Sequence, residues 1–171
     1  MALGHVIRKV RVEDHPFILA LLRAAFEKDT EAKIVEALWD CRGIKLERVA
    51  DIGGVVAGYI CYSAVETRPE LDGVLLGLGP LAVASDHRNK GVGAELIKES
   101  LAECRKNGAR LIAVLGDPNY YARFGFEPAS DRKMKWAGFD AGDAFRVITH
   151  EDIDTEELRT IHYHPAFDIA S

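Results

Sequence analysis

The chain has 171 residues, 48% of them apolar, which suits one domain with a core of ordinary size. Its 22 Lys and Arg are outnumbered by 27 Asp and Glu, and this net charge of −5 is spread along the chain, which argues against non-specific nucleic-acid binding. Because no apolar run reaches the roughly 18–20 residues of a membrane span and no signal-peptide pattern opens the chain, we expect a cytoplasmic protein without a membrane partner.

The residues that most often hold metals or form disulfides are too scattered here to do either. Cys41, Cys61 and Cys104 are odd in number and far apart, which favours reduced core thiols. His162 and His164 stand close together without a third ligand nearby, so we assign no metal. Since no repeat or low-complexity segment divides the chain, we predict a single domain over residues 1–171, with its core at about 3–149, and leave a homodimer open.

In the first third of the chain, apolar residues recur with the period of a strand and then with that of a helix. The predicted elements, in chain order, are a strand over 5–11, helices over 14–26 and 31–40, and strands over 45–50 and 55–63. Gly53-Gly54, between the last two strands, is typical of a hairpin turn.

The segment 73–115 is the most informative part of the sequence. Residues 73–83 are almost entirely apolar, as in a strand buried on both faces, and a short polar turn leads from them into an amphipathic helix over 92–106. A further apolar strand follows at 111–115, so this segment predicts strand, crossover helix and parallel strand.

The remaining segments complete an α/β fold. We predict a short helix over 118–124, strands over 133–136 and 145–149, and loops over 66–73 and 129–143. Together the elements indicate one domain with a mixed central β-sheet flanked by α-helices.

The turn Arg88-Asn89-Lys90-Gly91-Val92-Gly93-Ala94 lies where the buried strand ends and the helix begins. At such a place the free backbone N–H groups and the helix dipole favour an anion, and glycines let a pyrophosphate approach closely. Arg88 and Lys90 add positive charge. The pattern lacks both the third glycine of a dinucleotide-binding turn and the Gly-Lys-Ser/Thr of a nucleoside-triphosphate loop.

Two motifs in the right order give the chain a family resemblance. Leu81-Ala82-Val83, followed by Arg88-x-x-Gly91-x-Gly93, a helix and an apolar strand, resembles the acetyl-CoA motif of the GNAT N-acetyltransferases. Tyr121-Ala122-Arg123-Phe124-Gly125-Phe126 is similar to their later Tyr-x-x-Phe/Leu-Gly-Phe segment. Within the family, Gly79-Pro80-Leu81-Ala82-Val83 and Leu115-Gly116-Asp117-Pro118-x-Tyr120-Tyr121 resemble the YhbS-like branch.

The resemblance implies a cofactor site and a catalytic acid. Backbone groups of Leu81, Ala82 and Val83 would pair with the acetyl carbonyl and the pantetheine arm of acetyl-CoA. The pyrophosphate would be wrapped by Asn89, Lys90, Gly91, Val92, Gly93 and Ala94, with Arg88 at the rim. Tyr121 would protonate the departing thiolate, since a phenol pKa of about 10 lies near that of a thiol at about 8.5. Tyr120 would be core or cleft wall. Asn119 is a doubtful equivalent of the asparagine that many members place several residues before the tyrosine.

The residues around the acceptor are much less defined. Asp117 is the first candidate for the base that deprotonates the amine, although it also suits an N-cap, and Glu66 and Asp72 are weaker candidates. His87 suits a surface turn beside the pyrophosphate. We expect a small-molecule or peptide amine to enter through the loops near residues 25–41 and 66–73.

The predicted function is therefore direct acetyl transfer from acetyl-CoA to an unidentified amine. A CoA-binding sensor or regulatory module that has lost turnover is the alternative, and a longer acyl donor also remains open. The tyrosine and the unbroken glycine turn favour the enzyme.

Overall fold

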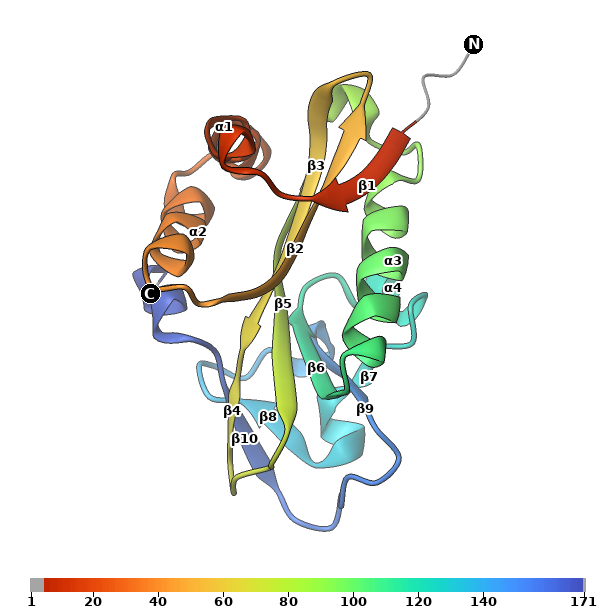
Figure 1. Ribbon diagram of the computed structural model, residues 1–171. Helices are drawn as coiled ribbons and strands as arrows, with labels where there is room; N and C mark the ends of the chain where they lie inside the picture. Colours follow the sequence, from red (N-terminus) through yellow and green to blue (C-terminus); the bar gives the residue numbers. More distant parts are fainter. Residues whose placement is uncertain (1–4, 171) are drawn as a thin grey trace.

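The computed structural model describes residues 5–170, so residues 3 and 4 of the expected core lie outside it (Figure 1). Within these residues the main sheet has seven strands in the order β1-β2-β3-β5-β6-β9-β7. They are β1 (His5–Lys9), β2 (Ile44–Ile52), β3 (Val55–Ala64), β5 (Val74–Val83), β6 (Ala109–Leu115), β9 (Phe145–Thr149) and β7 (Glu127–Pro128). Only the β5 and β6 pair is parallel among the pairs of this sheet, as the crossover pattern predicts.

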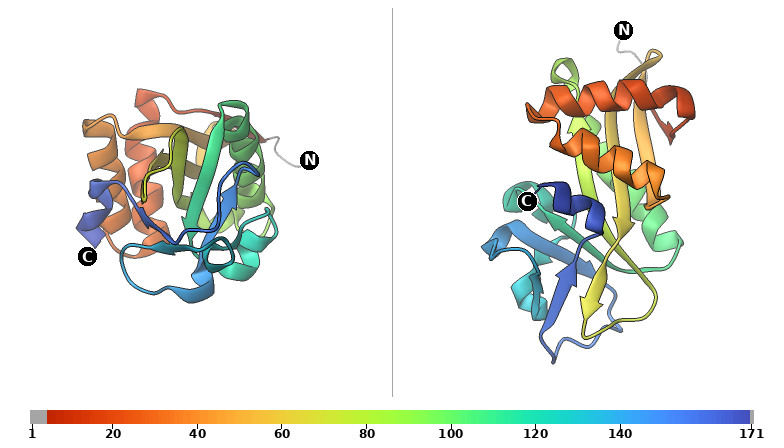
Figure 2. Two further views of the ribbon diagram at one scale, coloured as in Figure 1. Left: turned by 90° about the horizontal axis from the view of Figure 1, so that it is seen from below. Right: turned by 90° about the vertical axis from the view of Figure 1, so that its left-hand side faces the viewer.

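Helices cover both faces of the main sheet (Figure 1). One face is covered by α1 (His15–Phe26) and α2 (Thr30–Asp40), which lie next to each other across the strands in Figure 2. The opposite face is covered by α3 (Val92–Lys106) and the short α4 (Pro118–Ala122). None of the helices in the described part of the chain combines the length and apolarity needed to cross a bilayer. The predicted mixed sheet flanked by helices is confirmed.

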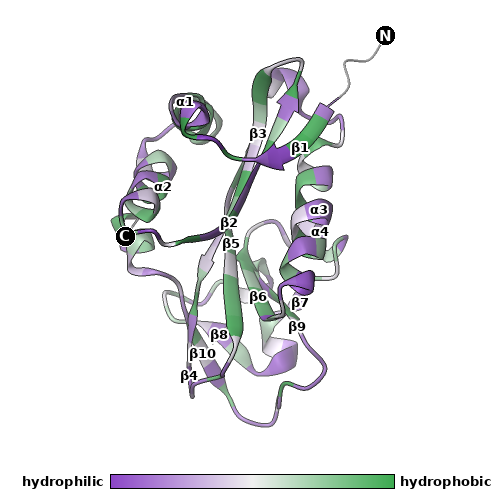
Figure 3. Cartoon of the chain, in the orientation of Figure 1, coloured by the Kyte–Doolittle hydropathy of each residue, from purple (hydrophilic) through white to green (hydrophobic). Residues whose placement is uncertain are grey.

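The core follows the apolar pattern of the sequence. Strands β5 and β6 are largely hydrophobic along their length, whereas the helices show apolar and polar stripes (Figure 3). The predicted stripe of α3 is buried, and it consists of Val92, Leu96, Ile97, Leu101 and Cys104. A buried Leu or Ile stabilises a fold by about 1.5–3 kcal/mol relative to the exposed side chain, so this stripe holds the helix in place and fixes where its N-terminus lies.

A smaller sheet packs against the same face of the main sheet as α1 and α2, over the part of it that these helices leave uncovered. Among the described residues it contains β4 (Glu66–Arg68), β10 (Arg159–His162) and β8 (Met134–Trp136). Two of these strands were not predicted: β4 falls in the expected loop at 66–73, and β10 follows residue 149. Both are short and find their partner far away in the sequence, so no local periodicity marks them. Ile153 and Ile161 bring residues beyond 149 into a buried cluster.

The link between β1 and α1 is fixed by an ion-pair network. Arg8 donates two hydrogen bonds to Asp14, at 2.7 and 3.0 Å, and a third to Asp51 at 3.0 Å. The hydrogen bond from Arg8 lowers the pKa of Asp14 to about 2. The sequence predicted a helix start at Asp14, and Asp14 is the N-cap residue of α1, at the end of a 3-10 turn over Val12–Asp14. Its carboxylate binds Arg8 and the backbone N–H of Arg11 rather than the first turn of α1.

The parallel strands β5 and β6 separate halfway along β5. Their pairing runs from Val74 with Ala109 to Gly77 with Ala113, after which β5 continues to Val83 paired only with β3. The pairing of β3 with β5 has a β-bulge at this point. Ile60 pairs with Leu81 and Tyr62 with Leu78, so two residues of β5 lie opposite Cys61 alone. The second half of β5 therefore presents an open backbone edge toward the end of β6.

Candidate active site

Two cavities lie beside the open edge of β5. The first, here called the turn cavity, measures about 560 Å³ and lies between the end of β5, the turn after it and α4. The second, here called the aromatic cavity, measures about 530 Å³ and lies between the separated ends of β5 and β6. Leu81 and Tyr120 line both, so the two cavities adjoin at these side chains.

The turn cavity is built mainly from the N-terminus of α3. Of the predicted turn, it is lined by Arg88, Asn89, Gly91, Val92, Gly93 and Ala94, whereas Lys90 does not line it. Asn89 and Gly91 have φ values of 61° and 82°, a left-handed conformation that glycine and asparagine adopt most readily. No side chain caps α3 within the described residues, so the first-turn N–H groups of this helix are open to an anion.

Positive side chains surround this helix N-terminus. The Arg88 Nε donates to the Val83 carbonyl at 3.2 Å, so this guanidinium folds back onto the end of β5. Arg123 also lines the cavity, with its guanidinium carbon 5.4 Å from the Tyr120 ring centroid, and so does His87. Arg123 was not among the residues predicted to contact the cofactor, although it belongs to the segment Tyr121–Phe126 that resembles the family's tyrosine motif.

At the open edge of β5, the backbone N–H and C=O groups of every second residue point away from β3. The Ala84 N–H donates to the Ala57 carbonyl at 2.8 Å, which directs residues 82 and 84 toward β3. Leu81 and Val83 therefore direct their backbone groups to the opposite, open edge. Ala82 lines neither cavity, because its side chain is buried among residues of α1, β2 and β3. Of the three strand residues predicted to contact the cofactor, only Leu81 and Val83 line a cavity.

The two tyrosines are positioned by α4. Asp117 caps this helix, its Oδ1 accepting the Asn119 N–H at 3.0 Å, as its N-cap reading predicted. Tyr121 is 9% exposed and lines the aromatic cavity, and its hydroxyl forms no hydrogen bond within residues 5–170. The ring packs against Gly116, where a Cβ would lie 2.6 Å from a ring carbon. Gly116 thus provides the space that Tyr121 occupies.

Burial dominates the electrostatics of both phenols. It raises the pKa of Tyr121 well above the ordinary value for tyrosine, with smaller contributions from Tyr120 and Asp117. Burial also raises the pKa of Tyr120, while Arg123 acts in the opposite direction. The Tyr120 hydroxyl lies against α3, because a Cβ on Gly93 would come within 2.8 Å of it. Tyr120 is thus a wall shared by the two cavities.

The aromatic cavity is assembled from distant segments. Besides β5, β6 and the tyrosines, it is lined by Phe26, Glu31 and Ile34, which lie within the expected acceptor region at 25–41. It is also lined by three residues that the sequence did not point to: Trp136, Tyr163 and Phe167. The expected acceptor route through residues 25–41 thus contributes to this cavity, but the loop 66–73 does not, because it lines a separate cavity at the far end of β5. The residues after β10, here called the C-terminal segment (residues 163–170), contribute Tyr163 and Phe167 to the cavity where that loop was expected.

Two carboxylates line the aromatic cavity. Asp117 is exposed, whereas the Oε2 atom of Glu31 is buried without a hydrogen-bond partner in the described part of the chain. Glu66 and Asp72, the weaker base candidates, do not line this cavity. Glu31 lies in the first turn of α2, where an acidic residue is common because it complements the helix dipole, so its place in the site had no separate signal in the sequence.

Other polar residues singled out in the sequence lie away from the two cavities. His162 ends β10 opposite Glu66 of β4, and the His164 Nε2 lies 3.8 Å from the Cys41 Sγ. Asn119 lines neither cavity.

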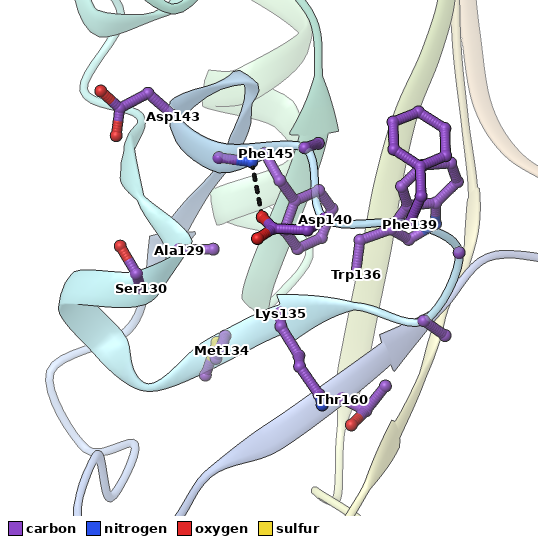
Figure 4. Close-up of a pocket in the computed structure, with 14 residues that line it drawn as sticks. Ala129, Ser130, Met134, Lys135, Trp136, Phe139, Asp140, Asp143, Phe145 and Thr160 are labelled. Carbon is purple, nitrogen blue, oxygen red and sulfur yellow. Dashed lines mark hydrogen bonds between the residues drawn. The ribbon is translucent and has the colours of Figure 1, made fainter.

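A further cavity of about 540 Å³ lies on the other side of Trp136 (Figure 4). Trp136 and Phe139 form an aromatic pair at its edge, with ring centroids 4.6 Å apart, and the Asp140 Oδ1 accepts the Gly142 N–H at 2.9 Å. This cavity shares only Trp136 with the aromatic cavity and includes neither tyrosine nor any residue of β5. The two tyrosines and the open edge of β5 therefore lie at the other two cavities and not at this one.

Known proteins share this fold and are similar to this chain in sequence. A sequence profile of the Acetyltransferase (GNAT) family matches residues 15–126. The Escherichia coli K12 protein described as uncharacterized N-acetyltransferase YhbS is 40% identical over 144 residues, covering 81% of this chain and 84% of that protein. A crystal structure of Escherichia coli YhbS in complex with CoA has a TM-score of 0.90 at 34% identity, covering 98% of this chain and 94% of that one. A GNAT family acetyltransferase from Brucella melitensis in complex with acetyl-CoA has a TM-score of 0.81 at 33% identity, covering 96% and 99% of the two chains. The resemblance to the YhbS-like branch is confirmed, and the chain belongs to the GNAT family of acetyltransferases.

Proposed function

We propose that this protein transfers the acetyl group of acetyl-CoA directly to an amine bound in the aromatic cavity. The observation that carries the proposal is the junction of the two cavities, where an uncapped helix N-terminus, an open strand edge and the two tyrosines meet. The two similar structures that hold CoA and acetyl-CoA support the choice of cofactor.

The turn cavity would hold the pyrophosphate of acetyl-CoA. The N–H groups of Val92, Gly93 and Ala94 provide the donors, and Arg88 and Arg123 provide positive charge beside them. The pantetheine arm would follow the open edge of β5, where its amides pair with backbone groups of Leu81 and Val83. This path leads from the turn cavity to the aromatic cavity and brings the thioester to Tyr121.

Transfer needs one bond to form and one to break. The amine first loses a proton, to Asp117 or to water in the cavity, and its lone pair then attacks the acetyl carbonyl carbon. As the C–N bond forms, the C–S bond breaks, and the Tyr121 hydroxyl gives a proton to the departing thiolate of CoA. The nitrogen loses a second proton to solvent as the C–S bond breaks, so the products are an amide and CoA, and the phenolate regains its proton from solvent.

The raised pKa of Tyr121 has two effects on this step. It keeps the phenol protonated over the whole physiological range, so the acid is always in the required form. It also makes the phenol a weaker acid. The thiolate forms in the same desolvated cavity, however, and burial raises the pKa of a thiol as it does that of a phenol, so the two groups remain matched.

Two measurements separate the enzyme from a CoA-binding module without turnover. Calorimetric titration with acetyl-CoA tests the cofactor site, and release of free CoA thiol over a panel of amines tests transfer. We expect both binding and amine-dependent thiol release. Binding without thiol release from any amine would instead support the module.

We also propose a cytoplasmic location. The cysteines of the described chain are free thiols, which suits a reducing compartment.

A further inference from the structure

Glu31 lines the aromatic cavity, and one oxygen of its carboxylate is buried without a hydrogen-bond partner in the described part of the chain. The Glu31 Oε2 is shielded from solvent and accepts no hydrogen bond within residues 5–170. A buried acceptor left unpaired is costly, and a carboxylate more so, because folding removes the water that would solvate it. An N–H donor bound in the cavity would offset this cost and form a charge-assisted hydrogen bond.

Six of the sixteen residues that line this cavity are aromatic. The rings come from the end of α1, from α4, from β8 and from the C-terminal segment, and they belong to Phe26, Tyr120, Tyr121, Trp136, Tyr163 and Phe167. The volume of about 530 Å³ is within the usual range for a small-molecule site. Aromatic walls bury the apolar body of a ligand and also attract a cation through their ring faces.

We propose that the acceptor is a primary amine attached by a short link to an aromatic or other bulky apolar group. Glu31 binds the ammonium, and the rings enclose the carbon skeleton. This inference rests on the proposed function, because it names the acceptor for the same acetyl transfer.

Hydrophilic amines suit this cavity poorly. A polyamine or an aminoglycoside brings several charged or hydroxyl groups, each of which needs a polar partner when buried. Of the two carboxylates that line the cavity, Asp117 is exposed and its Oδ1 is already used to cap α4. One ammonium and one apolar body therefore match the lining better than several polar groups.

The same chemistry occurs in a free amine and at the N-terminus of a peptide that begins with an aromatic residue. The acceptor panel therefore has two aromatic arms, with phenylethylamine and tryptamine in one and a Phe-Ala-Ala tripeptide in the other. Ethanolamine, spermidine and kanamycin form the hydrophilic arm. We expect kcat/KM for at least one aromatic arm to exceed that of each hydrophilic amine by about tenfold or more. The aromatic arm with the higher kcat/KM shows whether the acceptor is a free amine or a peptide N-terminus.

Two matched pairs of variants test the contacts. Glu31→Gln should raise KM for the aromatic amine about 10- to 100-fold, because a buried hydrogen bond to a charge is lost, while Glu36→Gln, exposed on the same helix, should not. Phe26→Ser should raise KM about three- to tenfold, while Phe17→Ser, on the same helix at 65% exposure, should not. Calorimetry should show an unchanged Kd for acetyl-CoA in all four variants, which separates a loss of the acceptor contact from misfolding.

These experiments give different results if only the acceptor class is wrong and if acetyl transfer itself is wrong. Turnover that favours spermidine, ethanolamine or kanamycin, or a Glu31→Gln enzyme with unchanged KM, would overturn the acceptor class and leave acetyl transfer intact. If wild-type protein failed to bind acetyl-CoA, or bound it without releasing thiol to any amine, the inference would fall together with the proposed function.

Discussion

The turn cavity and the aromatic cavity meet at Leu81 and Tyr120 but are built in different ways. The turn cavity is formed mainly by one continuous stretch, residues 87–94, and its main donors are the backbone N–H groups at the start of α3. The aromatic cavity is formed by side chains from α1, α2, β5, β6, α4, β8 and the C-terminal segment.

Because of this difference, we expect the turn cavity to serve cofactor binding with few sequence requirements, and the aromatic cavity to determine which acceptor is bound. Backbone donors bind any diphosphate of the right shape, and a strand-to-helix turn can supply them with few sequence requirements. Side chains from several segments can vary independently, so they set the acceptor. Changes in the turn cavity should therefore alter cofactor binding, and changes in the aromatic cavity should alter acceptor binding or chemistry.

The largest effect is expected for Tyr121→Phe, in the aromatic cavity beside the residues where the two cavities join. The ring and its packing against Gly116 stay, while the proton for the thiolate is removed. A general acid contributes about 10²- to 10⁴-fold in rate, so kcat should fall by this factor while KM for acetyl-CoA stays within about twofold. Steady-state kinetics check this, with Tyr120→Phe as the control that should change kcat far less. If the variant kept more than about a third of wild-type kcat while chemistry limits turnover, the acid is another group.

The next largest effect is expected in the turn cavity, from Gly93→Val. Its side chain would fill the space beside the helix N–H groups and would also contact the Tyr120 hydroxyl, so the Kd for acetyl-CoA should rise by about tenfold or more, measured by calorimetry. The double variant Gly93→Val/Tyr120→Phe separates the two causes, because it removes only the clash with the hydroxyl. Weak binding in both variants supports the pyrophosphate site. Single-variant affinity within about threefold of wild type would contradict it.

The sequence predicted the parts of the molecule whose signal is local. The apolar run of β5, the stripe of α3 and the glycine turn between them each carry their own pattern, so both the central crossover and the turn cavity could be expected from the sequence. Tyr163 and Phe167 could not, because β10 is four residues long and reaches the sheet only through strands far away in the sequence. For Gly93 the sequence predicted one of two constraints, the close approach of a phosphate. The structure adds the second, because a Cβ at this position would collide with the Tyr120 hydroxyl.

A smaller effect is expected for Arg88→Ala at the rim of the turn cavity. The N–H groups of α3 remain, and an exposed charge is screened, so the Kd for acetyl-CoA should rise by about three- to tenfold at low salt and by less at high salt. Arg88→Lys is the matched control, because it keeps the charge and loses the hydrogen bond from Nε to the Val83 carbonyl. A loss that equals that of Gly93→Val and is independent of salt would show that Arg88 mainly holds the end of β5.

The smallest effect concerns pH and tests whether burial in the aromatic cavity controls the protonation of Tyr121. Since burial raises the pKa of Tyr121 above its ordinary value of about 10, the phenol stays protonated as pH rises from 6 to 9, and loss of the acid begins only above that range. The ratio of wild-type kcat to Tyr121→Phe kcat should therefore change by less than about twofold between pH 6 and 9. Ionisation of the amine and of other groups changes both rates alike and cancels in the ratio. A ratio that falls toward one between pH 7 and 9 would mean that Tyr121 loses its proton there, and that the aromatic cavity does not shield it as its burial indicates.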